Sequence, residues 1–237
     1  MGPDTPRVGV ISFPGSNGDH DALNALVADL AVSTRLIDYR ETDLSAFDAI
    51  VLPGGFSYGD ALRCGAIARF SPIMEPLRAF AEEGKPVLGI CNGFQILCEA
   101  HLLPGALLRN ATLRFHCHWT YIRIESTDTS WTRQLTAGDV LRLPVAHGDG
   151  AYFANDELVA QLEENGQIVA RYCTADGAVS ADANTNGSVA GIAAVANERG
   201  NVIGLMPHPE RATNALIGGA DGLRLLQGLL APAPIGA

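Results

Sequence analysis

Cys91 stands where an apolar run, Val87–Ile90, meets a segment that continues with the spacing of a helix. Gly89 and Gly93 flank it, and this G-x-C-x-G arrangement permits the tight strand-to-helix turn that lifts a nucleophile above a sheet. A cysteine at a helix N-terminus is favoured as the thiolate, the form that attacks a carbonyl carbon. Taken alone, the segment is also compatible with an inert buried cysteine at a strand end.

A thiolate nucleophile needs a proton carrier, and residues 206–211 (MPHPER) offer one. His208 precedes a proline, which favours extended backbone, so we expect the side chains of His208 and Glu210 to point the same way. A carboxylate beside an imidazole fixes its tautomer and stabilises its charged form. Without the cysteine turn these residues would suggest only a solvated loop. Together with Cys91 they predict a Cys-His-Glu catalytic triad.

Acyl chemistry also needs hydrogen-bond donors for a developing oxyanion. Gly54 and Gly55 follow an apolar run, residues 50–52, and can aim backbone N–H groups at a neighbouring strand end. The N–H of Asn92, the residue after the nucleophile, is the usual second donor, and the family resemblance given below implies Gly55 and Asn92 as the oxyanion hole. In a chain without Cys91, the Pro-Gly-Gly sequence would be read as an ordinary turn.

These residues must be positioned by strands that end at one edge of a sheet. The first hundred residues alternate apolar runs with helical spacing, as in a parallel sheet that is covered on both faces. This alternation of strand-like and helix-like segments predicts an α/β fold. We expect strands at residues 8–13, 34–39, 49–52 and 86–90, and helices at residues 19–30, 72–83 and 92–100.

The pattern changes after residue 103, where strand-like segments follow one another with few helices between them. This change predicts an added mixed or antiparallel β section, with a hairpin turn at residues 198–201. The whole chain, residues 1–237, is expected to form one domain with a frayed tail at residues 231–237. We expect strands at residues 119–125, 140–147, 167–173, 189–196 and 202–206, and a closing helix at residues 222–230.

Composition excludes several classes of function. The chain has 237 residues, 47% of them hydrophobic, which is enough to bury a large core. Its formal charge of −10 argues against a nucleic-acid partner. No apolar run approaches the roughly 20 residues that span a bilayer, and no segment resembles a signal peptide, so we expect a cytoplasmic protein with no membrane association.

The cysteines and histidines do not predict a disulfide framework or a metal site. Five cysteines, odd in number and without a C-x-x-C pair, suit reduced thiols. His116 and His118 flank Cys117, but the sequence offers no second ligand pair, so we expect no metal. The five cysteines are Cys64, Cys91, Cys98, Cys117 and Cys173.

Longer segments carry a family resemblance. They are PGGFSYGDALRCGAIARF (residues 53–70), GKPVLGICNGFQIL (84–97), RNATLRF (109–115), PVAHGDGAYF (144–153), NTNGS (184–188) and GLMPHPERA (204–212). Together they resemble the small glutaminase subunit of phosphoribosylformylglycinamidine synthase, and they span nearly the whole chain. The cysteine turn and the His-x-Glu motif are shared by all triad-type, class I glutamine amidotransferases. The FSYGD-x-LRCGAIA and GICNGFQIL segments look specific to this member.

The resemblance implies a flavodoxin-like open, mainly parallel sheet with helices on both faces and an added mixed or antiparallel section. It also implies that Cys91 attacks the side-chain amide of glutamine, that glutamate leaves, and that ammonia is delivered onward for purine biosynthesis. By the same analogy, Gly54, Gln95, Asn110 and Phe115 are expected to line the substrate pocket. His147 and Tyr152 are expected near the face that meets the synthetase partner.

The chain lacks a G-x-x-x-x-G-K-[ST] loop, so we expect no cofactor in it and the ATP chemistry in another chain. The resemblance implies two partners: a large synthetase subunit that uses ATP and Mg, and a small third subunit. Some positions depart from the family pattern, among them Gly18 and His20 in place of cysteine and arginine, and Asp149 and Ala151 in place of glutamate and arginine. None of these changes falls on the triad.

Two alternatives remain open from the sequence. One is a stand-alone cysteine hydrolase on the same architecture, such as a γ-glutamyl hydrolase or a DJ-1/PfpI-like enzyme, against which the FSYGD and PHPE segments argue. The other is a binding subunit whose triad residues are present but misaligned. Free glutaminase activity separates the first from a synthetase subunit, and thiol titration tests the second.

Overall fold

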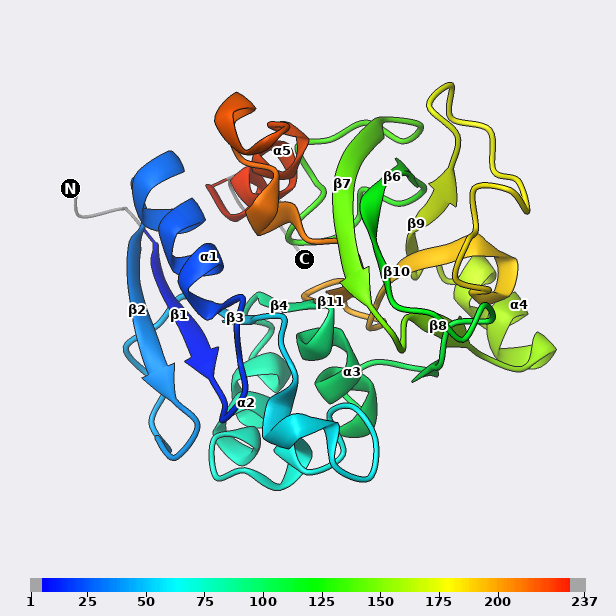
Figure 1. Ribbon diagram of the computed structural model, residues 1–237. Coiled ribbons are helices and arrows are strands. Elements are labelled where there is room, and N and C mark those ends of the chain that lie inside the picture. The colour runs from blue at the N-terminus through cyan, green and yellow to red at the C-terminus, as the bar shows by residue number, and fades with distance from the viewer. Residues whose placement is uncertain (1–5, 231–237) are drawn as a thin grey trace.

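One nine-stranded sheet runs through residues 6–230, the part of the chain that the structure, a computed structural model, describes (Figure 1). The strand order is β2-β1-β3-β4-β11-β10-β9-β6-β7. The first five strands in this order pair in parallel, and the pairings from β11 to β7 are antiparallel. We call these two parts the parallel half and the antiparallel half.

The parallel half agrees with the prediction from sequence. β3, β4 and β11 are buried along their whole length, as expected for strands covered on both faces. Figure 1 shows α1 and α5 on one side of the sheet and α2 and α3 on the other. The bounds are β1 Arg7–Ser12, α1 Asp19–Asn24, β2 Ser33–Asp38, β3 Ala49–Leu52, α2 Met74–Glu82, β4 Val87–Ile90, α3 Asn92–Glu99 and β11 Val202–Leu205; a π-helical turn, Ala25–Asp29, extends α1.

The antiparallel half also exists as predicted, and the turn at residues 198–201 joins an antiparallel pair. The expected strand at residues 189–196 starts late, because Val189–Gly191 form a 3-10 turn in which Ala190 has φ 50°. The remaining bounds are β6 His116–Ile124, β7 Val140–His147, β9 Ile168–Cys173 and β10 Ile192–Ala196 in the sheet, and the separate antiparallel pair β5 Ala106–Leu108 and β8 Ala151–Phe153.

Helix α4, Asp156–Glu164, was not predicted from the sequence. Its N-terminus does carry a signal: the Asn155 side chain accepts a hydrogen bond from the N–H of Leu158, and Asp156 and Glu157 occupy the first turn. Leu162 of this helix is fully buried, and Leu158 and Val159 pack against the core while partly buried, so its apolar residues lie on one face.

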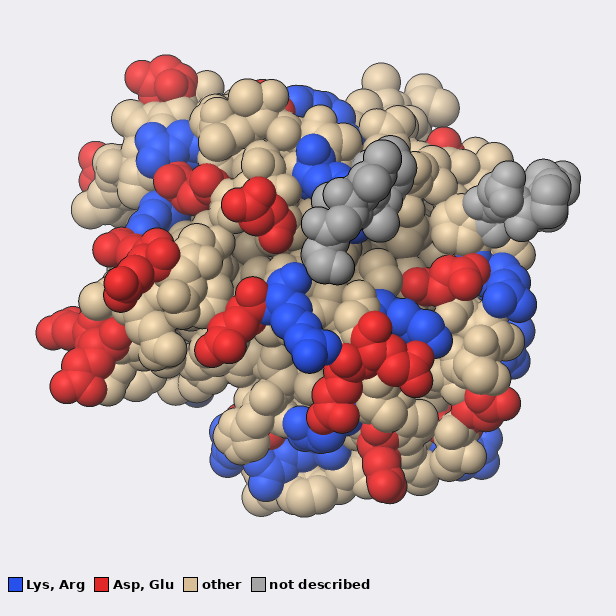
Figure 2. All heavy atoms as spheres, turned by 180° about the vertical axis from the view of Figure 1, so that it is seen from behind, with Lys and Arg blue, Asp and Glu red and all other residues tan. Residues whose placement is uncertain are grey.

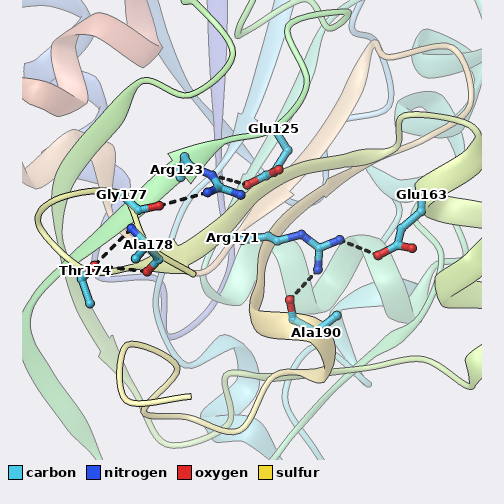
Figure 3. Close-up of polar contacts among 8 residues, drawn as sticks. All are labelled: Arg123, Glu125, Glu163, Arg171, Thr174, Gly177, Ala178 and Ala190. Atoms are coloured by element: carbon cyan, nitrogen blue, oxygen red, sulfur yellow. Dashed lines mark hydrogen bonds and ion pairs between the residues drawn. The ribbon is translucent and has the colours of Figure 1, made fainter. Parts of the chain in front are cut away.

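Two arginines on β6 and β9 fasten the long segment between β9 and β10 to the sheet (Figure 3). Arg123 donates to Glu125 at 2.8 Å and to the carbonyl of Gly177 at 3.0 Å. Arg171 forms an ion pair with Glu163 of α4 at 2.7 Å and donates to the carbonyl of Ala190. The arginines bind both carboxylates and backbone carbonyls, so they order a segment that contains little regular structure of its own.

The C-terminal helix α5, Asp221–Leu226, continues into a 3-10 turn, Gln227–Leu230, close to the predicted closing helix. A Cβ on Gly222 would lie 2.0 Å from the carbonyl oxygen of Pro209, so only glycine lets α5 pack this closely on the 206–211 segment. The prediction of one domain stays a prediction, and its tail, residues 231–237, lies outside the described residues.

Charged side chains of both signs share the face seen in Figure 2, where clusters of Lys and Arg lie beside Asp and Glu. Within residues 6–230, no helix is long and apolar enough to cross a membrane. The predicted cytoplasmic location stays a prediction.

Candidate active site

Cys91 occupies a strained turn between the last residue of β4 and the first residue of α3. Its backbone has φ 50° and ψ −102°, a conformation that non-glycine residues rarely adopt. Its N–H donates to the carbonyl of Leu205 on β11 at 2.8 Å. A Cβ on Gly93 would lie 2.1 Å from the carbonyl oxygen of Leu52, so glycine is needed there because α3 packs directly on the end of β3.

His208 and Glu210 lie just after β11 and are 1% and 3% exposed. His208 Nδ1 and Glu210 Oε1 are 2.6 Å apart. The expectation of one extended segment was wrong for Glu210: His208 is extended, but Pro209–Arg211 form a 3-10 turn that brings the carboxylate back to the imidazole. The predicted pairing is therefore present, with a tighter backbone than the sequence argument assumed.

The charge state of His208 follows from its neighbours. Burial alone would lower the pKa of His208, but the Glu210 carboxylate and Cys91 raise it to about 10. His208 Nε2 and Glu210 Oε2 are both buried with no hydrogen-bond partner among residues 6–230. The Glu210 carboxylate therefore favours the protonated imidazole, and Nε2 is the ring nitrogen left for Cys91 or for a group that enters the site.

The Gly54 backbone fits between His208 and Cys91. A Cβ on Gly54 would lie 2.6 Å from His208 Cε1 and 3.6 Å from Cys91 Cβ. The ends of β3, β4 and β11 therefore meet at one point, as the carboxyl ends of parallel strands do in open α/β sheets. The structure brings together Cys91, His208, Glu210 and Gly54.

The loop after β3 presents the backbone of Gly55 to the same region. Gly55 has φ 152°, and a Cβ on it would lie 2.7 Å from Ser16 Cα. Its pairing with Ser16 uses the N–H groups of Asn17 and Phe56, which leaves the Gly55 N–H outside this ladder. Asn92 is the first residue of α3, where N–H groups have no acceptor within the helix. The oxyanion hole of Gly55 and Asn92 stays a prediction that this geometry permits.

Gln95 belongs to a buried chain of amide hydrogen bonds. The N–H of Ser57 donates to Asn92 Oδ1 at 3.1 Å, Asn92 Nδ2 donates to Gln95 Oε1 at 2.9 Å, and Gln95 Nε2 donates to the carbonyl of Asp149 at 2.6 Å. The chain ties the loop after β3 to the loop between β7 and β8 beneath the nucleophile. The predicted contact of Gln95 with a substrate stays a prediction, since both its Oε1 and its Nε2 already form hydrogen bonds within the protein.

Asn110 and Phe115 have different environments. Asn110 is fully buried and accepts from the N–H of Gly150 at 3.0 Å. Phe115 is 53% exposed and stacks on Phe56, with ring centroids 6.4 Å apart. Phe56 follows Gly55, so the aromatic pair lies beside the loop after β3, and Asn110 braces the loop that follows β7. Their predicted roles in the substrate pocket are not tested by these contacts.

His147 and Tyr152 are buried, at 3% and 1% exposure, so neither offers side-chain surface to a partner in this structure. The hydroxyl of Tyr152 donates to the carbonyl of Pro104 at 2.9 Å, and His147 contacts Asn110. Their predicted place near the synthetase face stays a prediction.

Two carbonyl groups of β7 were missed by sequence reasoning. The carbonyl of Ala146 accepts from the Cys91 thiol at 3.8 Å, and the carbonyl of Pro144 accepts from the N–H of His208 at 2.8 Å. Arg211 was missed too: its guanidinium lies 3.8 Å from Glu210 Oε1 and 2.9 Å from Asp21. Backbone carbonyls carry no residue-type signal, but a basic residue directly after Glu210 was visible in the sequence.

Comparison with known proteins identifies the family of this chain. Residues 5–218 match the model of the CobB/CobQ-like glutamine amidotransferase domain. The chain is 62% identical over 224 residues to phosphoribosylformylglycinamidine synthase subunit PurQ of Thermomicrobium roseum, covering 94% of this chain and 95% of that protein. It is 54% identical, with the same coverage, to the subunit PurQ of Salinibacter ruber.

Solved structures show the same fold. A structure of PurLQS from Thermotoga maritima superposes with a TM-score of 0.84 at 42% identity, covering 95% of this chain and 98% of that one. Another glutamine amidotransferase from Thermotoga maritima, at 18% identity and a TM-score of 0.54, covers 88% of this chain and 77% of that one and shares the fold alone. The predicted class I glutamine amidotransferase fold is confirmed. From the domain match and the high identity over almost its whole length, the chain belongs to the PurQ family of phosphoribosylformylglycinamidine synthase subunits.

Proposed function

We propose that this chain hydrolyses glutamine to glutamate and ammonia through Cys91, His208 and Glu210. Its family makes it the glutamine amidotransferase component of phosphoribosylformylglycinamidine synthase, in purine biosynthesis. The observation that supports the triad most directly is the buried His208–Glu210 pair at 2.6 Å, packed with Cys91 around Gly54.

The proposed reaction follows from the charges at the site. Cys91 gives its thiol proton to His208 and attacks the amide carbon of glutamine as the thiolate, and the N–H groups of Gly55 and Asn92 stabilise the oxyanion. His208, protonated and aligned by Glu210, gives its proton to the departing nitrogen, so that ammonia leaves and a γ-glutamyl thioester forms. The neutral imidazole then takes a proton from water, which attacks the thioester and releases glutamate and the thiolate.

We also propose the partners. Relatives are named as subunits of a synthase, and the Thermotoga maritima structure is of PurLQS. The acceptor chemistry, with ATP and Mg, then belongs to a large synthetase subunit, and a small third subunit completes the complex. This chain needs no cofactor for the hydrolysis itself, since its own thiolate, imidazole and backbone donors supply every step.

The test of this function is Cys91→Ala in the reconstituted complex. Glutamine-dependent synthesis of the amidine should be abolished, because the nucleophile is lost, while synthesis from added ammonium salt should continue at close to the wild-type rate. Cys173→Ser is the matched control and should leave both activities in place. Equal loss of the glutamine-dependent and ammonium-dependent activities in Cys91→Ala would reject the proposed role of the thiol.

A further inference from the structure

Three histidines form a continuous row where β6 begins and β7 ends. His116 and His147 are opposite each other in the β6–β7 register, with ring centroids 6.0 Å apart. His118 lies two residues along the same strand, with its ring centroid 5.4 Å from that of His116. We call these three residues the histidine row. It runs from buried His147 to exposed His118.

The inner end of the histidine row adjoins the proposed nucleophile. Ala146, the residue before His147, accepts the hydrogen bond of the Cys91 thiol. A charge on His208 is also one of the causes that lower the pKa of His147, after burial and His116.

The outer end of the row reaches solvent. On β6, the face that carries His116 and His118 is the one on which Thr120, Ile122 and Ile124 are buried. His118 is exposed on this inward face, so the face becomes uncovered at that end of the strand. The row therefore runs from His147, the residue after Ala146, to the surface of the chain at His118.

The hydrogen bonds of Asn110 define the tautomer of His147. Asn110 Nδ2 donates to the carbonyls of Arg114 and His147, both at 2.9 Å, so Oδ1 must be the acceptor on its other side. Oδ1 accepts from the N–H of Gly150 at 3.0 Å and lies 3.1 Å from His147 Nδ1. The Nδ1 of His147 must then carry the proton, and its Nε2 carries a lone pair.

Two members of the row, His147 and His116, are also held uncharged. Burial lowers the pKa of His147 to about 3, and the neighbouring histidines His116, His208 and His118 contribute to this lowering. Burial and His118 lower the pKa of His116 as well. The hydroxyls of Thr112 and Thr185 lie 2.7 and 3.4 Å from the two ring nitrogens of His116 and can serve either tautomer. His147 and His116 are therefore neutral acceptors at physiological pH, in contrast to protonated His208.

Such a row suits one small molecule in particular. Ammonia donates hydrogen bonds through N–H, which a neutral imidazole accepts through its lone pair. A protonated imidazole would instead transfer its proton and convert ammonia to ammonium, which cannot attack an acceptor. Within residues 6–230, no group of three or more His, Cys, Asp or Glu side chains has the arrangement of a metal site.

We propose that the histidine row is the route by which ammonia leaves the Cys91 site, with its exit at His118. This inference rests on the proposed glutaminase function and adds to it the path of the product and the place on this chain where the synthetase takes it up.

The test uses the complex of this chain with its synthetase partners and compares two products of the same glutamine. Glutamate reports hydrolysis, and the amidine reports ammonia that reached the acceptor. Glutamate dehydrogenase with 2-oxoglutarate, added in excess in a parallel assay, captures ammonia that escapes into solution. Synthesis from ammonium salt reports the synthetase by itself.

His116→Phe removes the acceptor in the middle of the row and should lower the yield of amidine per glutamate by at least about threefold, with glutamine hydrolysis and ammonium-dependent synthesis within about twofold of wild type. The missing ammonia should be captured in solution. His116→Gln, which keeps an acceptor, should restore most of the yield. Cys117→Phe places the same bulk on the opposite face of β6 and serves as the control.

An unchanged yield of amidine per glutamate in His116→Phe would overturn the proposal. If His116→Phe fails to fold or to assemble, His118→Phe decides, because this residue is exposed and tolerates substitution; an unchanged yield there has the same meaning. A different result would mark failure of the proposed function itself. In that case the complex that carries Cys91→Ala would still release glutamate from glutamine.

Discussion

The two halves of the sheet contribute different kinds of group to the candidate site. The parallel half supplies side chains: Cys91 follows β4, and His208 and Glu210 follow β11. The antiparallel half supplies backbone, through the carbonyls of Pro144 and Ala146 on β7. Parallel strands end together at one edge and can gather reactive groups from distant parts of the sequence, whereas β7 lies alongside and positions them.

The difference extends to the two buried histidines nearest the site. His208, on the parallel half, faces Glu210, and its pKa is raised to about 10. His147, on the antiparallel half, faces an amide, and its pKa is lowered to about 3 by burial and by the neighbouring histidines. One fold thus keeps one imidazole as an acid and the other as a neutral acceptor, because Glu210 and Cys91 offset burial at His208, whereas at His147 burial and the neighbouring histidines act in the same direction.

The largest effect should come from His208→Ala. Loss of the proton carrier should reduce the glutaminase kcat of the complex by about 10³-fold or more. Glu210→Gln should reduce it by about 10- to 100-fold, because this change removes only the charge that orients the imidazole. Single-turnover formation of the thioester would measure both. Near-normal turnover in His208→Ala would show that the parallel half does not carry the chemistry.

The comparison of His208 with His147 also predicts a pH dependence. The folded-state pKa of His208 is raised from 6.5 to about 10, so the stability that its protonated form contributes is fully present below about pH 6.5 and is lost as pH rises towards 10. Glu210→Gln should remove most of this contribution. The free energy of unfolding of wild type relative to Glu210→Gln should therefore fall between pH 7 and pH 10. A difference that is constant with pH would show that the pair is not charged.

One added methyl group where the ends of β3, β4 and β11 meet should reduce activity strongly, but less than His208→Ala does. The added Cβ in Gly54→Ala would lie 2.6 Å from His208 Cε1 and should displace the imidazole, with a loss of roughly 10²-fold in kcat/KM. Gly148→Ala, on the antiparallel side, is the matched control, because its Cβ would meet only Phe115 at 3.7 Å. Similar activities of the two variants would contradict the close packing around Gly54.

These residues also show how far sequence alone reaches. The G-x-C-x-G turn and the strands around it were predictable, because strained turns need glycine and buried parallel strands are apolar throughout. The 3-10 turn at Pro209–Arg211 was not, although the His208–Glu210 pairing was. The carbonyl of Ala146 could not be predicted, since a backbone contact across 55 residues leaves no mark on residue type. Helix α4 was not predicted, although its Asn155 cap and the helical spacing of Leu158, Val159 and Leu162 were visible in the sequence.

In the antiparallel half, Asn110→Ala should affect stability more than chemistry. Asn110 is fully buried, and its side chain serves the N–H of Gly150, two carbonyls and His147. Its removal should cost about 2–3 kcal/mol of unfolding free energy, because buried groups are left unpaired. Urea unfolding measures the cost, and Asn165→Ala on the exposed end of α4 is the control. A cost equal to that of the control would mean that Asn110 does not hold the loop after β7.

The smallest effect should come from the cysteines other than Cys91. Burial raises the pKa of the Cys64 and Cys98 thiols well above the usual range and that of Cys173 to about 11, which leaves little thiolate at neutral pH. Cys117 is exposed but lies on the face of β6 away from the histidine row.

Serine at Cys117 or Cys173 should therefore change glutaminase activity by less than about twofold, within the usual range for substitutions away from a site. An electrophilic glutamine analogue should label Cys91 alone, while a general alkylating reagent should also reach Cys117, and peptide mass spectrometry distinguishes the two patterns. Labelling of Cys173 by the glutamine analogue would place the nucleophile at the end of β9, in the antiparallel half, and would reverse the division of roles between the two halves.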